Sequence, residues 1–381
     1  MVNKRTIPLC IAAIDQREVD AVSEVLYSGW LAHGPKVKEF EKKFAALIGV
    51  KHALAMNSCT SALELSLHCI DKKGEVLLPS FTFVASANAV ITTGHHPVFV
   101  DIDPLTRNID IEDAKRKLSS NTVAIMPIHY GGLSCEMDEI MDLSHQHGLM
   151  VIEDSAETLG GKYKGKYTGS FGIGCFSFYP TKNITTGEGG MLTTNNDDLA
   201  HLISMYRAHG ISGSAHDREK LKQPWEREAH VAGFNYRMCD ILAAVGVVQL
   251  SKLEAMNQKR RDHAEYLNSR LPTDYLSTPF APEYSKHVYQ MYTILLEEGV
   301  DRSKFIHSLR EKGVMASVHF DPPVHQHKYY RELNACQTSL PNTEKVASSI
   351  VTLPMYPGLE RTDLDYMVDC VGTSIEDSLK Q

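Results

Sequence analysis

The segment CFSFYPTKNITTGEGGM, residues 175–191, decides the fold prediction because a single lysine directly follows an apolar strand candidate. This residue, Lys182, comes after the run CFSFYP and lies in a stretch rich in serine, threonine and glycine. A lysine that is desolvated in such a place can act as a Schiff-base nucleophile. Most lysines that follow strands are simply solvated, so the chemistry depends on partners elsewhere in the chain.

Around this segment, short apolar runs alternate with amphipathic stretches from about residue 38 to residue 250. Helical patterns follow residues 59, 82 and 134. Continuous apolar strands separated by helices predict an α/β domain with a mainly parallel sheet, in which ligands collect at the carboxyl ends of the strands. The strand candidates are EVLLPS (75–80), HPVFVDID (96–103), TVAIMPIHY (122–130), LMVIEDSA (149–156), CFSFYP (175–180) and GGMLTT (189–194).

A change of pattern near residue 250 predicts a second, smaller domain. A short helix, DILAAVGVVQL, precedes this point, and the long polar helix SKLEAMNQKRRDHAEYLNSRL follows it. A strand-like run YQMYTILLEEG, a helix DRSKFIHSLREKG and a His- and Pro-rich stretch come next. We therefore expect a large α/β domain over residues 1–250, including the N-terminal segment, and a small α+β domain over residues 251–381.

The composition excludes several classes of protein. A formal net charge of −8 argues against a general nucleic-acid binder, which needs a basic face. No run approaches the roughly 18 apolar residues of a membrane span, and the N-terminal stretch is not typical of a signal peptide. The eight cysteines form no CxxC pair, which indicates a reducing compartment. We expect a cytoplasmic enzyme with no nucleic-acid or membrane partner.

Two polar groups are candidates for chemistry beside the lysine. Asp154 ends the strand LMVIED, 28 residues before Lys182, and a buried carboxylate at a strand end needs a cation or a hydrogen-bond donor. A helix cap or a structural ion pair would also explain this carboxylate. A cofactor that has a pyridinium nitrogen and an aldehyde needs one carboxylate and one amine on opposite sides of its ring, and Asp154 and Lys182 are such a pair.

The run AMNSCTSALELSL predicts a phosphate site at the start of a helix. Free N–H groups and the positive end of the helix dipole favour a dianion near Cys59 and Thr60, although an ordinary N-cap has the same sequence. Ser177 can add a hydroxyl group to this site. Phe83 follows a strand end and can stack on a cofactor ring, or it can belong to the core.

Taken in order, these motifs resemble the DegT/DnrJ/EryC1/StrS family of sugar aminotransferases, which depend on pyridoxal 5'-phosphate (PLP) and have the aspartate aminotransferase-like fold type I. The resemblance implies a large domain with a mainly parallel seven-stranded sheet flanked by helices, and a smaller C-terminal α+β domain. It covers nearly the whole chain through SGWLAHGPKVKEFE, NSCTSAL, PSFTFVASANAV, HPVFVDID, VIEDSAETLG, FSFYPTKNITTGEGG and GFNYRMCDILAA.

The resemblance also implies roles for individual residues around the cofactor. Lys182 would bind PLP as a Schiff base and move the proton, and Asp154 would keep the pyridine nitrogen protonated. Glu157 would contact the cofactor's 3'-oxygen, where many relatives carry Gln or His. A carboxylate beside a phenolate repels it unless one of them is protonated. The phosphate would be bound by the backbone of Cys59 and Thr60, together with Ser177.

Further positions are implied at a subunit interface and in the substrate site. Asn235 in GFNYRMCD, or Arg237 beside it, would reach the phosphate of the neighbouring subunit, which implies a homodimer with shared active sites. The nucleotide-sugar would be surrounded by Trp30, Tyr179, His319 and His325. The His-rich stretch that contains His319 and His325 predicts no metal site, because two prolines break the helical spacing of a ligand pair.

The resulting hypothesis is ping-pong transamination from L-glutamate to a nucleotide-linked 4-keto-6-deoxy sugar. A keto-cyclitol aminotransferase shares every motif and stays open as an alternative. A non-catalytic PLP-binding regulator is a second alternative, against which the intact set of Lys182, Asp154 and Ser177 argues. A sugar 3-dehydratase of the same fold carries histidine in place of the lysine, so Lys182 argues against that activity.

Overall fold

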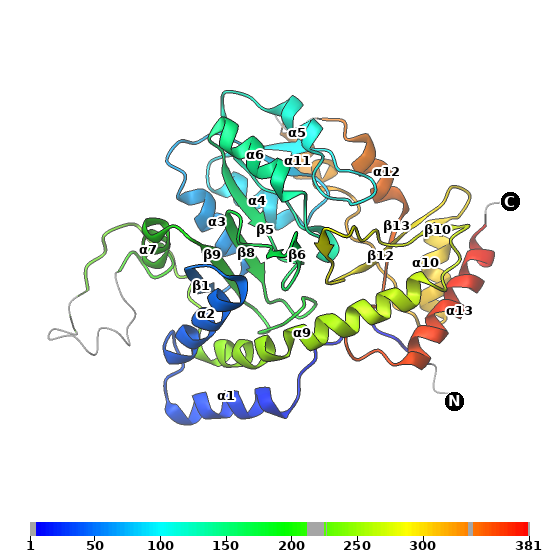
Figure 1. The fold of residues 1–381 in the computed structure, drawn as a ribbon, viewed down its shortest axis with the longest axis horizontal. Coiled ribbons are helices and arrows are strands. Elements are labelled where there is room, and N and C mark those ends of the chain that lie inside the picture. The colour runs from blue at the N-terminus through cyan, green and yellow to red at the C-terminus, as the bar shows by residue number, and fades with distance from the viewer. Residues whose placement is uncertain (1–4, 212–224, 226, 334–337, 380–381) are drawn as a thin grey trace.

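A seven-stranded sheet forms the centre of the molecule in the computed structural model, which describes residues 5–211, 225, 227–333 and 338–379 (Figure 1). Its strand order is β1-β9-β8-β5-β4-β2-β3. Only β9 runs antiparallel to its neighbours, so the predicted mainly parallel sheet is confirmed. The strands are β1 (His52–Met56), β2 (Glu75–Pro79), β3 (His96–Val100), β4 (Thr122–Ile125), β5 (Met150–Asp154), β8 (Ile173–Ser177) and β9 (Gly190–Thr194).

Five of the six strand candidates contain one of these strands and the sixth, CFSFYP (175–180), overlaps β8, but the sequence did not reveal β1. Its residues HALAM include two alanines and no β-branched side chain, so they carry a weak strand signal. The strand forms because it pairs with β9 along its whole length, from His52 opposite Thr194 to Met56 opposite Gly190. Pairing between segments far apart in the chain therefore completes the sheet.

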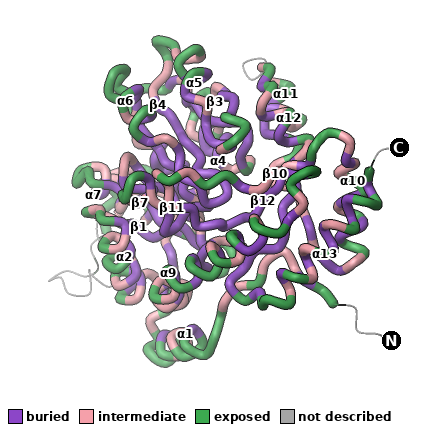
Figure 2. Tube along the Cα trace, turned by 45° about the vertical axis from the view of Figure 1, so that its right-hand side comes forward, coloured by how far each residue is buried: buried purple, intermediate pink, exposed green. Residues whose placement is uncertain are grey.

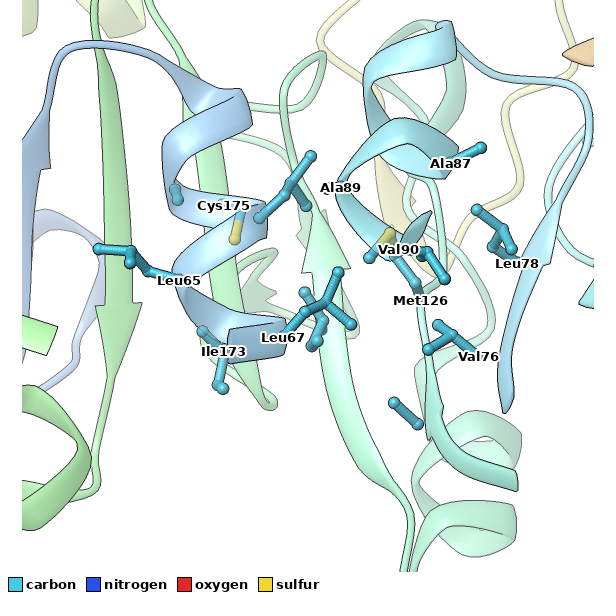
Figure 3. Close-up of a cluster of buried hydrophobic side chains, with 14 of the residues drawn as sticks. Leu65, Leu67, Val76, Leu78, Ala87, Ala89, Val90, Met126, Ile173 and Cys175 are labelled. Atoms are coloured by element: carbon cyan, nitrogen blue, oxygen red, sulfur yellow. The ribbon is translucent and has the colours of Figure 1, made fainter. Parts of the chain in front are cut away.

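Helices cover both faces of the sheet, as continuous apolar strands require. On one face, α3 (Cys59–His68) and α4 (Val84–Thr92) pack Leu65, Leu67 and Val90 toward Val76, Ile173 and other strand residues (Figure 3). On the other face lie α5 (Ile111–Lys117) and α6 (Met137–His147), with α2 (Pro35–Ile48) and α9 (Asp240–Asn268) beside them. α7 (Asp197–Tyr206) joins the α3 side. The predicted helices after residues 59, 82 and 134 are α3, α4 and α6.

The helix α9 is the longest of the described residues and runs uninterrupted through position 250 (Figure 1). Its first half packs on α1 (Gln16–Ser28) and α2, and its second half enters another buried cluster through Ala264 and Leu267. The two helices predicted on either side of residue 250 are therefore one. The domain boundary at this position stays a prediction.

The second cluster is built around a three-stranded sheet of β10 (Leu276–Ser277), β12 (Tyr292–Leu296) and β13 (Ile350–Leu353). The helices α10 (Arg302–Glu311) and α13 (Arg361–Ser378) cover it, and the N-terminal residue Ile7 is buried in it. Figure 2 shows both buried regions in purple beneath exposed helix surfaces. The remaining elements are the strands β6 (Lys162–Tyr163), β7 (Lys166–Tyr167) and β11 (Ser285–Lys286), the helices α11 (Lys328–Glu332) and α12 (Pro341–Ser349), and two 3₁₀ turns.

None of the helices formed by the described residues is both long and apolar enough to cross a lipid bilayer. The seven cysteines of the described residues are free thiols, and the eighth, Cys336, lies outside those residues.

Candidate active site

A cavity of about 500 Å³ lies at the carboxyl ends of β5 and β8, where the sheet predicts a ligand site. Residues from the N-terminal segment and from the small sheet close it on the other side. Nine of the predicted site residues line this one cavity: Cys59, Thr60, Phe83, Asp154, Glu157, Ser177, Tyr179, Lys182 and His319.

Asp154 is a buried carboxylate in the wall of the cavity. The Ser86 hydroxyl donates to its Oδ2 atom at 2.8 Å, and the Ala156 N–H donates to its Oδ1 atom at 3.1 Å. Burial raises the pKa of the Asp154 carboxyl, and the Ser86 hydrogen bond opposes this shift. Within the described part of the chain, the carboxylate forms no ion pair. It can therefore accept a cationic partner from a ligand.

Lys182 and Glu157 form an ion pair inside the cavity, with 3.3 Å between Nζ and Oε1. The second oxygen of Glu157, Oε2, accepts the Gly131 N–H at 2.9 Å. The loop that carries the lysine is fixed by Gln290, whose Nε2 atom donates to the Thr181 carbonyl at 2.8 Å. The amine is therefore held in place at the cavity wall, on a loop that follows β8.

The predicted phosphate site lies where α3 begins, next to β9. The Ser58 hydroxyl accepts the Ser61 N–H at 3.1 Å, which leaves the earlier N–H groups of the first turn without helical partners. Gly190 of β9 permits this arrangement, because a Cβ atom there would lie 2.5 Å from the Cys59 nitrogen. Cys59, Thr60 and Ser177 are thereby brought to one side of the cavity.

These residues fit PLP. Asp154 offers an unpaired carboxylate, Lys182 offers an amine, and the start of α3 offers N–H groups for a phosphate. The Phe83 side chain is 62% exposed at the cavity, so its ring is available for stacking. The cavity volume is within the range of small-molecule sites, about 300–1,000 Å³.

His319 also lines the cavity. Its Nδ1 atom lies 2.9 Å from the Thr352 hydroxyl oxygen. Burial lowers the pKa of His319, with Lys182 acting in the same direction and Glu157 opposing both. We therefore expect a neutral imidazole at pH 7, which can accept or donate one hydrogen bond without adding charge.

Three predicted residues do not line the cavity of their own chain. Trp30 precedes α2, and its indole N–H lies 3.4 Å from the His33 carbonyl. Asn235 is exposed beside Ala208. His325 is buried against Ser80. The predicted cross-subunit contact of Asn235 stays a prediction, and so do the predicted substrate contacts of Trp30 and His325.

The sequence did not indicate several of the residues that line the cavity. Leu9 and Cys10 come from the N-terminal segment, and Gln290, Thr352 and Met355 come from the small sheet and its flanks. A polar residue within the apolar run YQMYTILL was a usable signal for Gln290. The described residues contain no group of three or more His, Cys, Asp or Glu that could hold a metal ion.

Comparison with known proteins gives consistent matches over nearly the whole chain. The model of the DegT/DnrJ/EryC1/StrS aminotransferase family matches residues 12–372. The "Spore coat polysaccharide biosynthesis protein SpsC" of Bacillus subtilis is 40% identical over 382 residues, which cover 97% of this chain and 98% of that protein.

Solved structures agree with this fold. PseC from Helicobacter pylori, described as an aminotransferase involved in the biosynthesis of pseudoaminic acid, is 29% identical with a TM-score of 0.91, covering 98% of this chain and 100% of PseC. The PLP form of the sugar aminotransferase Spr1654 from Streptococcus pneumoniae, which is described as putative, is 26% identical with a TM-score of 0.90. That match covers 99% of this chain and 100% of Spr1654.

Proposed function

Because the chain belongs to the DegT/DnrJ/EryC1/StrS aminotransferase family, we propose that it transfers the amino group of L-glutamate to a nucleotide-linked keto-deoxy sugar. The family makes it a PLP-dependent sugar aminotransferase. The donor, the nucleotide and a 4-keto-6-deoxyhexose as acceptor are our proposal. The observation that carries it is the unpaired carboxylate of Asp154 in the same cavity as the Lys182 amine.

Each of these cavity residues would have its own role in the proposed reaction. Bound PLP would supply an electron-withdrawing ring, which makes the proton beside the transferred nitrogen removable. Asp154 would keep a proton on the ring nitrogen, since its buried carboxylate forms no ion pair within the described chain. Lys182 would take the proton as a base and return it as an acid. Glu157 would orient the Lys182 amine, which lies 3.3 Å from its Oε1 atom.

A sugar acceptor is supported by polar groups of the cavity and by the names of the relatives. Tyr179, His319 and Thr352 line the cavity and contribute groups that can hydrogen-bond to sugar hydroxyls. PseC is described as acting in pseudoaminic acid biosynthesis, and SpsC in spore coat polysaccharide biosynthesis. We place the new amine at C4, because the central motifs resemble perosamine-type enzymes.

We also propose a homodimer in which the partner subunit completes the site. Apolar side chains of α1 and its surroundings are exposed on the single chain, including Val19 at 51%, Leu26 at 54% and Tyr27 at 92%. Exposed apolar side chains that gather on one helix are typical of an interface. The exposed Asn235 would then reach the phosphate in the partner's cavity. A cytoplasmic location is part of the proposal and is supported by the free thiols.

The proposal is tested by incubating the PLP-loaded enzyme and L-glutamate with a panel of acceptors. The panel contains nucleotide-linked 3-keto and 4-keto deoxy sugars and keto-inositols, and the products are identified by mass spectrometry and NMR. Amination of a nucleotide 4-keto sugar at C4 is the expected result. Exclusive amination of keto-inositols would replace the proposal by its cyclitol alternative.

A further inference from the structure

Ser80 and His325 join two parts of the chain that lie 245 residues apart. Ser80 follows β2 and is fully buried, and His325 is 5% exposed in the stretch after the small sheet's first strands. Three hydrogen bonds connect the two segments. The Val324 N–H donates to the Ser80 carbonyl at 3.0 Å, the His325 N–H donates to the Ser80 hydroxyl oxygen at 2.9 Å, and that oxygen lies 2.7 Å from Nδ1 of His325.

The proton positions in this link follow from a third residue, Glu344. Its Oε1 atom lies 3.3 Å from Nε2 of His325, so the Nε2 atom carries the proton that the carboxylate accepts. Nδ1 of the neutral ring is then an acceptor, and the Ser80 hydroxyl donates to it. Burial lowers the pKa of His325, which favours this neutral ring. All polar atoms of the two side chains are satisfied.

The arrangement resembles a serine–histidine–acid triad, but the serine has no access to solvent. Neither Ser80 nor His325 lines the active-site cavity. A nucleophilic role is therefore excluded by burial, and a contact with substrate would need a different conformation. The link instead joins two chain segments that form neighbouring parts of the cavity wall.

One joined segment carries Phe83, three residues after Ser80. The other carries His319 and Phe320, five to six residues before His325. The Phe83 and Phe320 rings lie 6.4 Å apart at the cavity, and both residues line it. A shift of the His325 segment relative to Ser80 would therefore move His319 and Phe320 relative to Phe83 and the Lys182 amine.

We propose that Ser80 and His325 are positioning residues, which act through their mutual hydrogen bonds to set the places of His319 and Phe320 in the active-site cavity. The proposal rests on the proposed use of this cavity for amino transfer. It reassigns His325 from a substrate contact to a support of the wall behind it. Displacing reacting groups by about 1 Å can cost a factor of about 10² in rate, so a loss of this link is measurable in catalysis.

The test compares Ser80→Ala, His325→Gln and His325→Asn in the PLP-loaded enzyme. Asn places an amide oxygen near the position of Nδ1 and can still accept from Ser80, whereas Gln places its amide near Nε2 and cannot. We expect Ser80→Ala and His325→Gln to lower kcat/KM by about 10- to 100-fold with PLP still bound, and His325→Asn to recover most of the loss. The matched control is His95→Gln, because His95 is 1% exposed and bonds Gly74 and Leu67 away from the cavity.

The donor step is read separately, from the change in absorption of bound PLP when L-glutamate or another L-amino acid is added. If the wild-type enzyme reacts with the donor but aminates no keto sugar, only the proposed acceptor is refuted. The rate of the donor step in the variants would then still test the Ser80–His325 link. The positioning role is overturned if Ser80→Ala keeps the wild-type kcat/KM, or if His325→Asn is as impaired as His325→Gln. It is also overturned if His95→Gln lowers kcat/KM equally, since the effect would then be a general loss of stability.

Discussion

Asp154 accepts a hydrogen bond from the Ser86 hydroxyl at 2.8 Å, inside the cavity whose only ion pair joins Lys182 and Glu157 among the described residues. The acid that we propose for the ring nitrogen is therefore held by a neutral donor. A buried carboxylate that forms no ion pair costs stability.

The first prediction concerns Asp154→Asn, which keeps the shape of the side chain and removes its charge. The folded pKa of this acid is raised, so the carboxylate destabilises the PLP-free protein as the pH rises from 3.8 through that pKa. We expect the variant to stabilise the PLP-free protein at pH 7 by on the order of 1 kcal/mol, and to lower kcat by about 10²-fold or more. Urea unfolding and steady-state kinetics measure the two effects. A less stable variant with full activity would contradict both.

The second prediction concerns Lys182→Ala. Without the amine, we expect kcat to fall by about 10³-fold or more, since the proton-transfer group is lost. The absorption band of lysine-linked PLP should also disappear from the purified protein. Lys43→Ala is the control, because Lys43 is exposed and pairs with Glu39 on the surface of α2. A Lys182→Ala protein that keeps the band would show that another amine binds the cofactor.

The third prediction concerns the phosphate site. We expect Ser177→Ala to raise the Kd for PLP by about 10- to 100-fold, the effect of one hydrogen bond to a charged group. Activity at saturating PLP should change little, because the serine is remote from the proton transfer in our proposal. Titration of the PLP-free protein, followed by absorption, measures the Kd. Ser204→Ala on the exposed side of α7 should leave it unchanged.

The fourth prediction concerns the pH dependence of stability. Burial, together with nearby Arg207, lowers the pKa of His33 from 6.5 to about 4. The unfolded chain therefore protonates His33 at a higher pH than the folded protein does. The free energy of unfolding falls for this reason as the pH drops from about 6.5 to about 4. We expect the free energy of unfolding of His33→Gln to fall less than that of the wild type over this pH range, by between about 1 and 3 kcal/mol. Denaturant unfolding at pH 7.5 and pH 4.5 tests it, and equal pH dependence in both proteins would contradict it.

The fifth prediction concerns the proposed homodimer. We expect Tyr27→Glu to raise the dimer Kd by about 30-fold or more, because an exposed aromatic side chain at an interface is often worth at least about 2 kcal/mol. Analytical ultracentrifugation measures the Kd. Tyr329→Glu is the matched control, since Tyr329 is also exposed but lies on α11, far from α1 in Figure 1. An unaffected dimer would move the interface away from α1.

The sequence itself determined six of the seven strands of the large sheet, and it indicated that Asp154 and Lys182 lie at the same edge. An apolar run such as LMVI, residues 149–152, is expected to be a buried strand, and the polar residues that follow it are expected near the edge of the sheet. Parallel strands bring their carboxyl ends to one edge, so Asp154 and the lysine after β8 were expected to meet. Local sequence also placed the start of α3, because Ser58 caps the helix.

Only the tertiary structure decided which distant segments complete the site. Cys10 and Gln290 reach the cavity from opposite parts of the chain, and the buried position of His325 depends on Ser80, 245 residues away. Nothing near His325 in the sequence distinguishes a substrate contact from a structural bond. The strand β1 likewise exists because β9 pairs with it. Periodicity reports which face of an element is buried, whereas contacts across the chain depend on how the elements pack.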